Sequence, residues 1–180
     1  MNTQQPLPPD SLGSPSGSAL SERITFYELK FYMLSNFSSF AVVYDGRDWS
    51  TSEHAYQAMK FHSYVLQEWV RNQRSAHDAM KAAQSKPGQY RSDWNEVKVP
   101  IMLEICRAKL QQHEYIQRKL METGDRELIE SSPIDSFWGW GPNKDGVNHL
   151  GRVWMTLRDE LRSGQNGQGH PSPTTDTPKS

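Results

Sequence analysis

The sequence predicts an α+β fold, a mostly helical single domain with a small antiparallel strand element. Apolar residues recur at helical spacing through most of the chain, which favours helices. Two short strand-like runs flank Asp45-Gly46, the dipeptide preferred in a tight hairpin turn. All six tryptophans lie between Trp49 and Trp154, and a chain of 180 residues is the size of one domain.

The domain is expected to span residues 23–162, between disordered tails at 1–22 and 163–180. The first tail carries four prolines among Ser and Gly, and the second has no large apolar side chain. Neither tail can bury enough surface to offset the entropy of ordering it. The core is therefore expected to form between the two tails.

The expected strands are short and the expected helices fill the rest of the domain. Strands are predicted at residues 24–28, 41–44, 47–49 and 128–129. Helices are predicted at residues 51–62, 66–74, 77–84, 93–111, 114–122 and, by the spacing of apolar residues, from 150 to 161. Ser50, Ser75 and Ser92 are placed as N-caps and Gly124 as a C-terminal cap, while Pro100 should kink or split its helix near Val99.

Composition excludes several classes of protein. Lys and Arg number 20 against 21 Asp and Glu, so the chain has no strong nucleic-acid signature. One cysteine, Cys106, rules out an intramolecular disulfide and suits a reducing compartment. No stretch resembles a signal peptide or a membrane span, so the expected location is cytoplasmic. No histidine pairs with a carboxylate at metal-ligand spacing, so no metal site is expected.

The helix predicted at residues 51–62 carries one polar stripe. Glu53, Gln57 and Lys60 lie at positions i, i+4 and i+7, and most other residues of the helix are apolar. The stripe is either a solvated face with a capping-box glutamate, or part of a buried helix lining a cleft. In the second case the carboxylate and the amine would shift each other's pKa values.

Two further segments could bind a ligand. Arg91 precedes a predicted helix and could hold a phosphate, with Trp94 stacking on a base, although the pattern by itself favours a capping motif plus a core tryptophan. The loop at residues 131–147 combines glycines with Phe137, Trp138 and Trp140. Long loops rich in aromatic residues are usually functional, so this loop is interpreted as part of a site.

Together these segments resemble the NADAR (YbiA-like) family. The resemblance spans essentially the whole predicted domain in the family's order, and its block from Ser52 to Phe61 is quite specific. The matching stretches are Leu34-Ser35-Asn36-Phe37, Trp49 to Phe61, Arg91-Ser92-Asp93-Trp94, Lys98, Arg107-Ala108-Lys109, Thr123-Gly124-Asp125, Asp135-Ser136-Phe137-Trp138-Gly139 and Asn148-His149-Leu150-Gly151.

The resemblance implies a hydrolase that cleaves the N-glycosidic bond of a phosphorylated ribosyl compound. The substrate would be a ribosylaminopyrimidine 5-phosphate of riboflavin synthesis or an ADP-ribose attached to guanine, and no metal or organic cofactor is expected. Glu53 is then the expected general acid/base, Lys60 the nucleophile or charge stabiliser, and Asp135 a reserve carboxylate. The residues expected to position the substrate are Asn36, Arg91, Trp94, Trp138, Gly139 and Asn148.

The sequence departs from the family where Ala83-Gln84 stands in place of a common Gly-Arg pair. The phosphate would then be held differently, by Arg91 or Lys86. Two non-enzymatic alternatives are a module that binds ADP-ribose or NAD without cleaving it, and a scaffold that uses its tails for protein contacts. Tight binding without turnover would mark the first alternative, and loss of function on tail deletion the second.

Overall fold

The structure is a computed structural model, and it describes residues 23–27 and 29–166. The tail expected at 1–22, and residues 167–180 of the second tail, lie outside the described residues. In the described part helices predominate over two pairs of short strands, one of them antiparallel. The predicted mostly helical α+β fold with a small antiparallel element is therefore confirmed.

The strands are β1 (Ile24–Thr25), β2 (Val42–Tyr44), β3 (Arg47–Trp49) and β4 (Leu128–Ile129). The helices are α1 (Ser52–Ala58), α2 (Tyr64–Arg71), α3 (Ala76–Gln84), α4 (Trp94–Gln112), α5 (Glu114–Met121) and α6 (His149–Asn166). Two 3-10 segments, η1 (Leu29–Leu34) and η2 (Pro87–Gln89), complete the elements.

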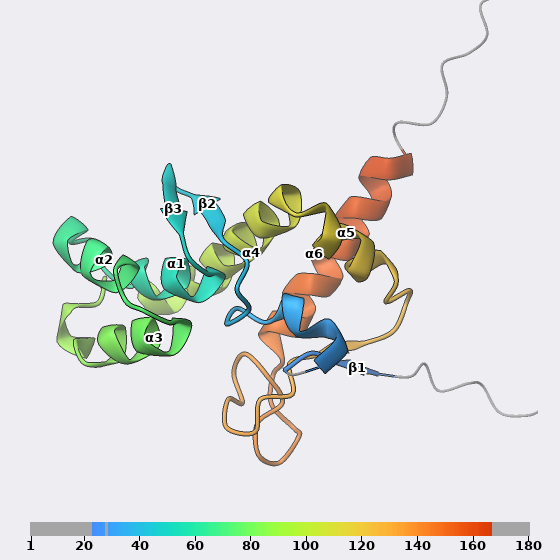
Figure 1. The fold of residues 1–180 in the computed structure, drawn as a ribbon. Coiled ribbons are helices and arrows are strands. Elements are labelled where there is room, and N and C mark those ends of the chain that lie inside the picture. Colours follow the sequence, from blue (N-terminus) through green and yellow to red (C-terminus); the bar gives the residue numbers. More distant parts are fainter. Residues whose placement is uncertain (1–22, 28, 167–180) are drawn as a thin grey trace, which may run out of the picture.

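The helices form two groups joined by α4. In Figure 1, α1, α2 and α3 make one end of the molecule, α5 and α6 the other, and α4 runs between them. The loop between β4 and α6 lies below the start of α6 in this view. The largest fully buried side chains, Trp49 and Trp154, belong to one hydrophobic core that extends through both groups.

The predicted hairpin is confirmed, and its turn has the expected backbone. Val42 pairs with Trp49 and Tyr44 with Arg47 in antiparallel register. Asp45 and Gly46 have φ of 51° and 69°, the left-handed values that a tight two-residue turn requires. The other strand pair is parallel and joins β1 to β4, so it connects the first described residues to the segment that precedes the long loop.

Several predicted boundaries are corrected at the starts of helices. The N-cap of α1 is Thr51 rather than Ser50, because Thr51 Oγ1 accepts the backbone N–H of His54. Glu53 is therefore not at a capping-box position, and its N–H donates to the backbone oxygen of Asn36 at 3.1 Å. The N-cap of α4 is Asp93 rather than Ser92.

Two helices also continue further than expected. α4 is not split and passes through Pro100, whose ring lies on an exposed face where the freed carbonyl of Glu96 can meet water. α6 runs to Asn166, four residues beyond the expected domain end, and Ser163 Oγ donates to the Asp159 carbonyl within that last stretch. Among the residues described, no helix combines the length and apolar character needed to cross a membrane.

Candidate active site

A cavity of about 200 Å³ lies where the two groups of helices meet. Its walls come from α1, the segment after η1, α3, α4, the loop after β4 and the start of α6. Five of the residues predicted to form a site line this cavity, although they are spread over the chain: Asn36, Glu53, Lys60, Asp135 and Trp138. The structure therefore brings together residues that the sequence separates by up to a hundred positions.

Glu53 enters the cavity from the first turn of α1. Its side chain is buried, and its Oε1 accepts a hydrogen bond of 2.7 Å from Gln57 Nε2. Burial raises the pKa of Glu53 to about 7, and the bond from Gln57 and the charge of Lys60 oppose the rise only in part. Because Glu53, Gln57 and Lys60 are all buried, the stripe lines a cleft and is not a solvated face.

Lys60 follows the end of α1 and is buried under aromatic rings. Its Nζ lies 5.1 Å from the ring centroid of Tyr90 and 5.9 Å from those of Tyr56 and Trp94. The described residues offer it no hydrogen-bonded oxygen and no salt bridge at close range. Burial lowers the pKa of Lys60, and the charge of Lys98 adds to this effect, while Glu53 opposes it.

Asp135 organises the loop that closes the cavity. Its Oδ1 accepts hydrogen bonds of 2.8 Å from the backbone N–H groups of both Phe137 and Trp138. The turn that results places the ring of Trp138 edge-on to Tyr56, with 5.3 Å between centroids. Asp135 therefore holds an aromatic wall in place while its carboxylate also lines the cavity.

Glu130 is a cavity residue that sequence reasoning missed. It directly follows β4, is 5% exposed, and burial together with Asp135 raises its pKa to about 8. Its Oε1 is buried without a hydrogen-bond partner in the described chain. Its place after a two-residue apolar strand gives no local signal of burial, because a charged residue at such a position is rarely buried.

Four predicted site residues do not line the cavity, and two of them flank it. The ring of Trp94 packs at a tilt against that of Tyr56, with 5.1 Å between centroids, and forms part of the aromatic surroundings of Lys60. Arg91 binds Asp93 through two hydrogen bonds of 2.6 and 2.8 Å, and its backbone N–H donates to the Lys60 carbonyl. Arg91 is thus engaged with a carboxylate on the outside of the site.

The other two, Gly139 and Asn148, hold the loop against β4. A Cβ on Gly139 would lie 2.4 Å from the backbone oxygen of Glu130, so only glycine allows this contact. Asn148 Nδ2 donates to the Leu128 carbonyl, and Asn148 Oδ1 accepts the N–H of Glu130 at 3.0 Å. Both residues therefore position Glu130 rather than reach into the cavity.

Gln57 and Gln84 also line the cavity and were not expected to bind substrate. Gln57 Oε1 is buried without a partner in the described chain and offers an acceptor to a ligand. Gln84 comes from α3, at the position where the family resemblance places an arginine. Within the described residues, Lys60 is then the one cationic side chain of the cavity wall, against Glu53, Glu130 and Asp135.

The arrangement suits proton transfer and nucleophilic attack inside a site of low polarity. Two carboxyl groups have pKa values raised toward neutrality, and one amine has its pKa lowered. Such groups can exchange protons near pH 7, where an unperturbed glutamate or lysine cannot. In the described part of the chain, no group of three or more His, Cys, Asp or Glu side chains could hold a metal ion.

Comparison with known proteins gives consistent matches. The NADAR domain family model matches residues 25–162. An N-glycosidase of Nostoc punctiforme is 37% identical over 145 residues, which are 78% of this chain and 93% of that protein. A riboflavin biosynthesis protein of Vibrio vulnificus is also 37% identical over 145 residues, 79% of this chain but 40% of that protein.

The N-glycosidase YbiA of Escherichia coli is 35% identical over 127 residues, 71% of this chain and 79% of YbiA. The NMR structure of YbiA superimposes with a TM-score of 0.78 at 30% identity, and covers 87% of this chain and 94% of its own. The likeness therefore extends from the sequence to the arrangement of the elements that build the cavity.

Proposed function

The chain belongs to the NADAR family, and from this premise we propose that it is an N-glycosidase that hydrolyses the bond between C1 of a phosphorylated ribose and a nitrogen. The observation that carries the proposal is the pairing of Glu53 and Lys60 in one buried cavity, with a carboxyl pKa raised to about 7 and an amine pKa lowered. The relatives named N-glycosidases support the same reaction class.

Lys60 acts as the nucleophile in this proposal. The unshared electron pair of its neutral Nζ forms a bond to C1 while the C1–N bond breaks and its electron pair leaves with the base, whose nitrogen takes up a proton. Burial and the charge of Lys98 lower the pKa of Lys60 and so favour the neutral amine that this step needs, although the charge of Glu53 opposes them.

Glu53 moves the proton that Lys60 must lose. The ionised carboxylate accepts a proton from Nζ after attack and passes it to the ribose ring oxygen as the ring opens, which leaves a Schiff base between Lys60 and C1. Water then adds to C1 and releases the sugar and the amine. A pKa of about 7 suits a group that both accepts and donates a proton in one cycle.

The remaining wall supports a small planar substrate. Trp138 and Tyr56 present aromatic surface, and Gln57 Oε1 offers a polar acceptor. Asn36 also lines the wall, and its amide contacts the sulfur atoms of Met102 and Cys106. A cavity of about 200 Å³ favours a small molecule, and one relative is named for riboflavin biosynthesis. We therefore place the ribosylaminopyrimidine 5-phosphate first among the two candidate substrates, ahead of ADP-ribosylated guanine.

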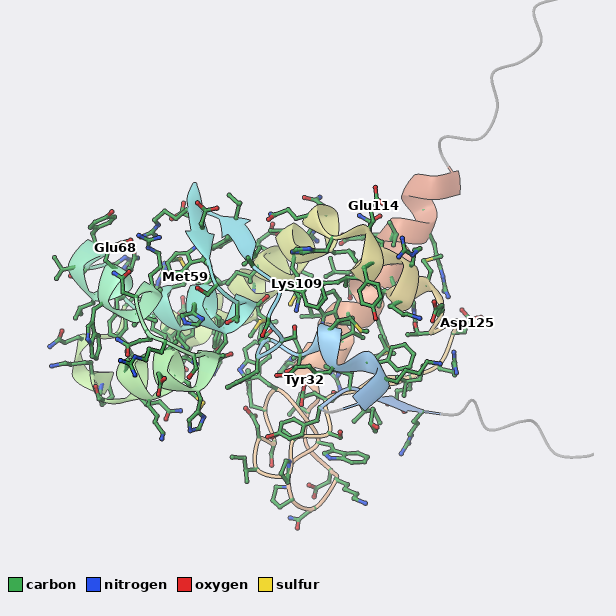
Figure 2. All side chains as sticks on the ribbon, viewed as in Figure 1. Tyr32, Met59, Glu68, Lys109, Glu114 and Asp125 are labelled. Carbon is green, nitrogen blue, oxygen red and sulfur yellow. The ribbon has the colours of Figure 1, made fainter. Side chains whose placement is uncertain are left out.

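The test is product formation by the purified protein, followed by mass spectrometry. The ribosylaminopyrimidine phosphate and an ADP-ribosylated guanine oligonucleotide are offered in parallel to wild type, Glu53→Gln and Glu114→Gln. Glu114 is an exposed residue at the start of α5 that does not line the cavity, and its variant is the matched control. Figure 2 shows Glu114 at the α5 end of the molecule.

We expect wild type and Glu114→Gln to release ribose 5-phosphate, and Glu53→Gln to lose about 10³-fold or more in kcat. Release of ADP-ribose instead would choose the second substrate. If wild type releases neither product but binds ADP-ribose tightly, the protein is a binding module and the proposal fails.

A further inference from the structure

The reaction proposed above requires a second acid, because the nitrogen that leaves C1 must take up a proton while Glu53 serves Lys60. We propose that Glu130 is the catalytic acid that protonates the departing nitrogen. This inference rests on the proposed N-glycosidase function and adds a residue that the sequence motifs do not include.

Glu130 reaches the cavity from a different element of the fold than Glu53 and Lys60 do. It lines the same cavity as Glu53 and Lys60 but comes from the end of β4, whereas both of those residues come from α1 or directly follow it. Two acids on different elements can serve two different atoms of one substrate. One of them lies beside the nucleophile, and the other is free to serve the leaving group.

One carboxyl oxygen of Glu130 has no hydrogen-bond partner among the described residues. Oε1 is buried and lacks a hydrogen-bond partner in the described part of the chain. A buried polar atom without a partner loses its hydrogen bonds to water and gains none in return, so it is rarely retained without a role. A substrate nitrogen in the cavity would supply the missing partner.

Hydrogen bonds and close packing hold the backbone around Glu130 in place. Its N–H donates to Asn148 Oδ1 at 3.0 Å, and its carbonyl accepts the N–H of Trp140 at 3.0 Å. Gly139 packs directly on it, and a Cβ there would come within 3.0 Å of the Glu130 Cγ. Asn148 adopts a φ of 57°, which few residues other than glycine favour, to make its part of this contact.

The protonation state agrees with the geometry. Burial, Asp135 and Glu53 all disfavour the charged form and raise the pKa of Glu130 to about 8, although a hydrogen bond from the Ser132 backbone opposes them. Lys60, the cationic side chain of the cavity wall among the described residues, follows α1 and is not among the groups that shift the pKa of Glu130. Glu130 is therefore mostly protonated at pH 7 and has a proton to give.

The step is balanced in atoms and charge. As Nζ of Lys60 bonds to C1, the C1–N electron pair moves to the leaving nitrogen, which takes the proton from the Glu130 carboxyl and departs as a neutral amine. Glu130 is left as a carboxylate, and it takes a proton back from the water that later adds to C1.

A change of leaving group tests the assignment. The ribosylaminopyrimidine phosphate needs a proton on its departing nitrogen, whereas nicotinamide ribonucleotide carries a cationic base that leaves neutral without one. We would measure kcat for wild type, Glu130→Gln and Glu53→Gln on both compounds, with Glu114→Gln as control. Glutamine keeps the size of the side chain and a hydrogen-bond donor, so a purely positioning role would survive in Glu130→Gln.

We expect Glu130→Gln to lose about 100-fold or more in kcat on the aminopyrimidine and less than about threefold on the nicotinamide compound. Glu53→Gln should lose activity on both. Equal losses on both compounds, or no loss on either, would overturn the assignment of Glu130.

The pH dependence gives an independent decision if wild type does not cleave the nicotinamide compound. On the aminopyrimidine, kcat of wild type should fall as pH rises through about 8, and Glu130→Gln should lack this fall. A fall that persists in the variant would contradict the proposal. Failure of wild type on every substrate is a different result, because it removes the N-glycosidase function itself.

Discussion

The cavity and the core between α4 and α6 each bury a lysine, and the two side chains meet very different surroundings. Lys109 of α4 is 0% exposed, and its Nζ donates to the Ser35 carbonyl at 3.0 Å and to Ser38 Oγ at 2.8 Å. Lys60 is 9% exposed and faces aromatic rings and the cavity without a fixed oxygen acceptor in the described residues. Figure 2 shows Lys109 in the middle of the molecule, where α4 passes the segment after η1.

The difference teaches how to separate a structural buried amine from a chemical one. Burial lowers the pKa of both lysines, to about 8 for Lys109, so the pKa shift alone does not distinguish them. The donors of Lys109 are committed to backbone and hydroxyl oxygens that hold the turn containing Asn36. Among the described residues Lys60 has no such acceptor, and in the proposed reaction its amine attacks a ligand in the cavity.

The largest expected effect follows from replacing each lysine by alanine. Lys60→Ala should reduce kcat by about 10⁴-fold or more, because it removes the nucleophile of the proposed reaction. Its melting temperature should stay within a few degrees of wild type, since the amine makes no fixed hydrogen bond to any residue that the structure describes. Borohydride added during turnover should link the sugar to Lys60 in wild type and leave Lys60→Ala unlabelled. Labelling at another lysine would assign the nucleophile elsewhere.

Lys109→Ala should act on stability instead. The variant leaves a cavity in the core and removes the donor of Ser35 and Ser38, so we expect a loss of about 3 kcal/mol in the free energy of unfolding. Urea unfolding measures it, with the half-buried surface ion-pair residue Lys119 replaced in the same way as the control, for which less than about 1 kcal/mol is expected. If Lys109→Ala stays as stable as the control, Lys109 is not a structural lysine and the contrast drawn with Lys60 is wrong.

A smaller effect should appear in the pH dependence of stability, with opposite signs in the two regions. Glu53 binds a proton more tightly in the folded state, with a pKa of about 7 against 4.5 when unfolded, so its contribution is present below pH 4.5 and is lost as pH rises to 7. Lys109 has a pKa lowered to about 8 from 10.5, so burying its charge destabilises the folded state below pH 8. This destabilisation decreases as pH rises from about 8 to 10.5.

Glu53→Gln should therefore be more stable than wild type at pH 8, on the order of 2 kcal/mol, and about equal to it at pH 4. Urea unfolding of both proteins at these two pH values measures the difference. A wild type whose stability relative to the variant does not change between them would show that Glu53 is not desolvated in solution.

Much of the fold and of the candidate site could be predicted from local sequence. The Asp45-Gly46 turn, the polar stripe of α1 and the aromatic loop each depend on residues close together in the chain. The spacing of Glu53, Gln57 and Lys60 was compatible with both a solvated face and a buried face lining a cleft, and it did not distinguish between them. Whether Glu53 faces water or a cavity depends on the loop and on β4, which are more than seventy residues away.

Glu130 shows most clearly where local reasoning ends. Nothing next to it in the sequence marks it as buried, because its burial arises from the parallel pairing of β1 with β4, the missing Cβ of Gly139 and the amide of Asn148. The same contacts changed the interpretation of Gly139 and Asn148, which the family resemblance placed against the substrate and the structure places against Glu130.

The sequence by itself therefore determined the fold class, the hairpin, most helices, the helix that carries Glu53 and ends just before Lys60, and the loop that carries Asp135. These features follow from periodicity, turn chemistry and caps, which act over a few residues. The tertiary structure alone decided which charged groups are buried, which of them keep a partner, and which face the cavity. Desolvation and hydrogen bonding depend on all the atoms around a group, and in a folded chain most of those atoms come from distant segments.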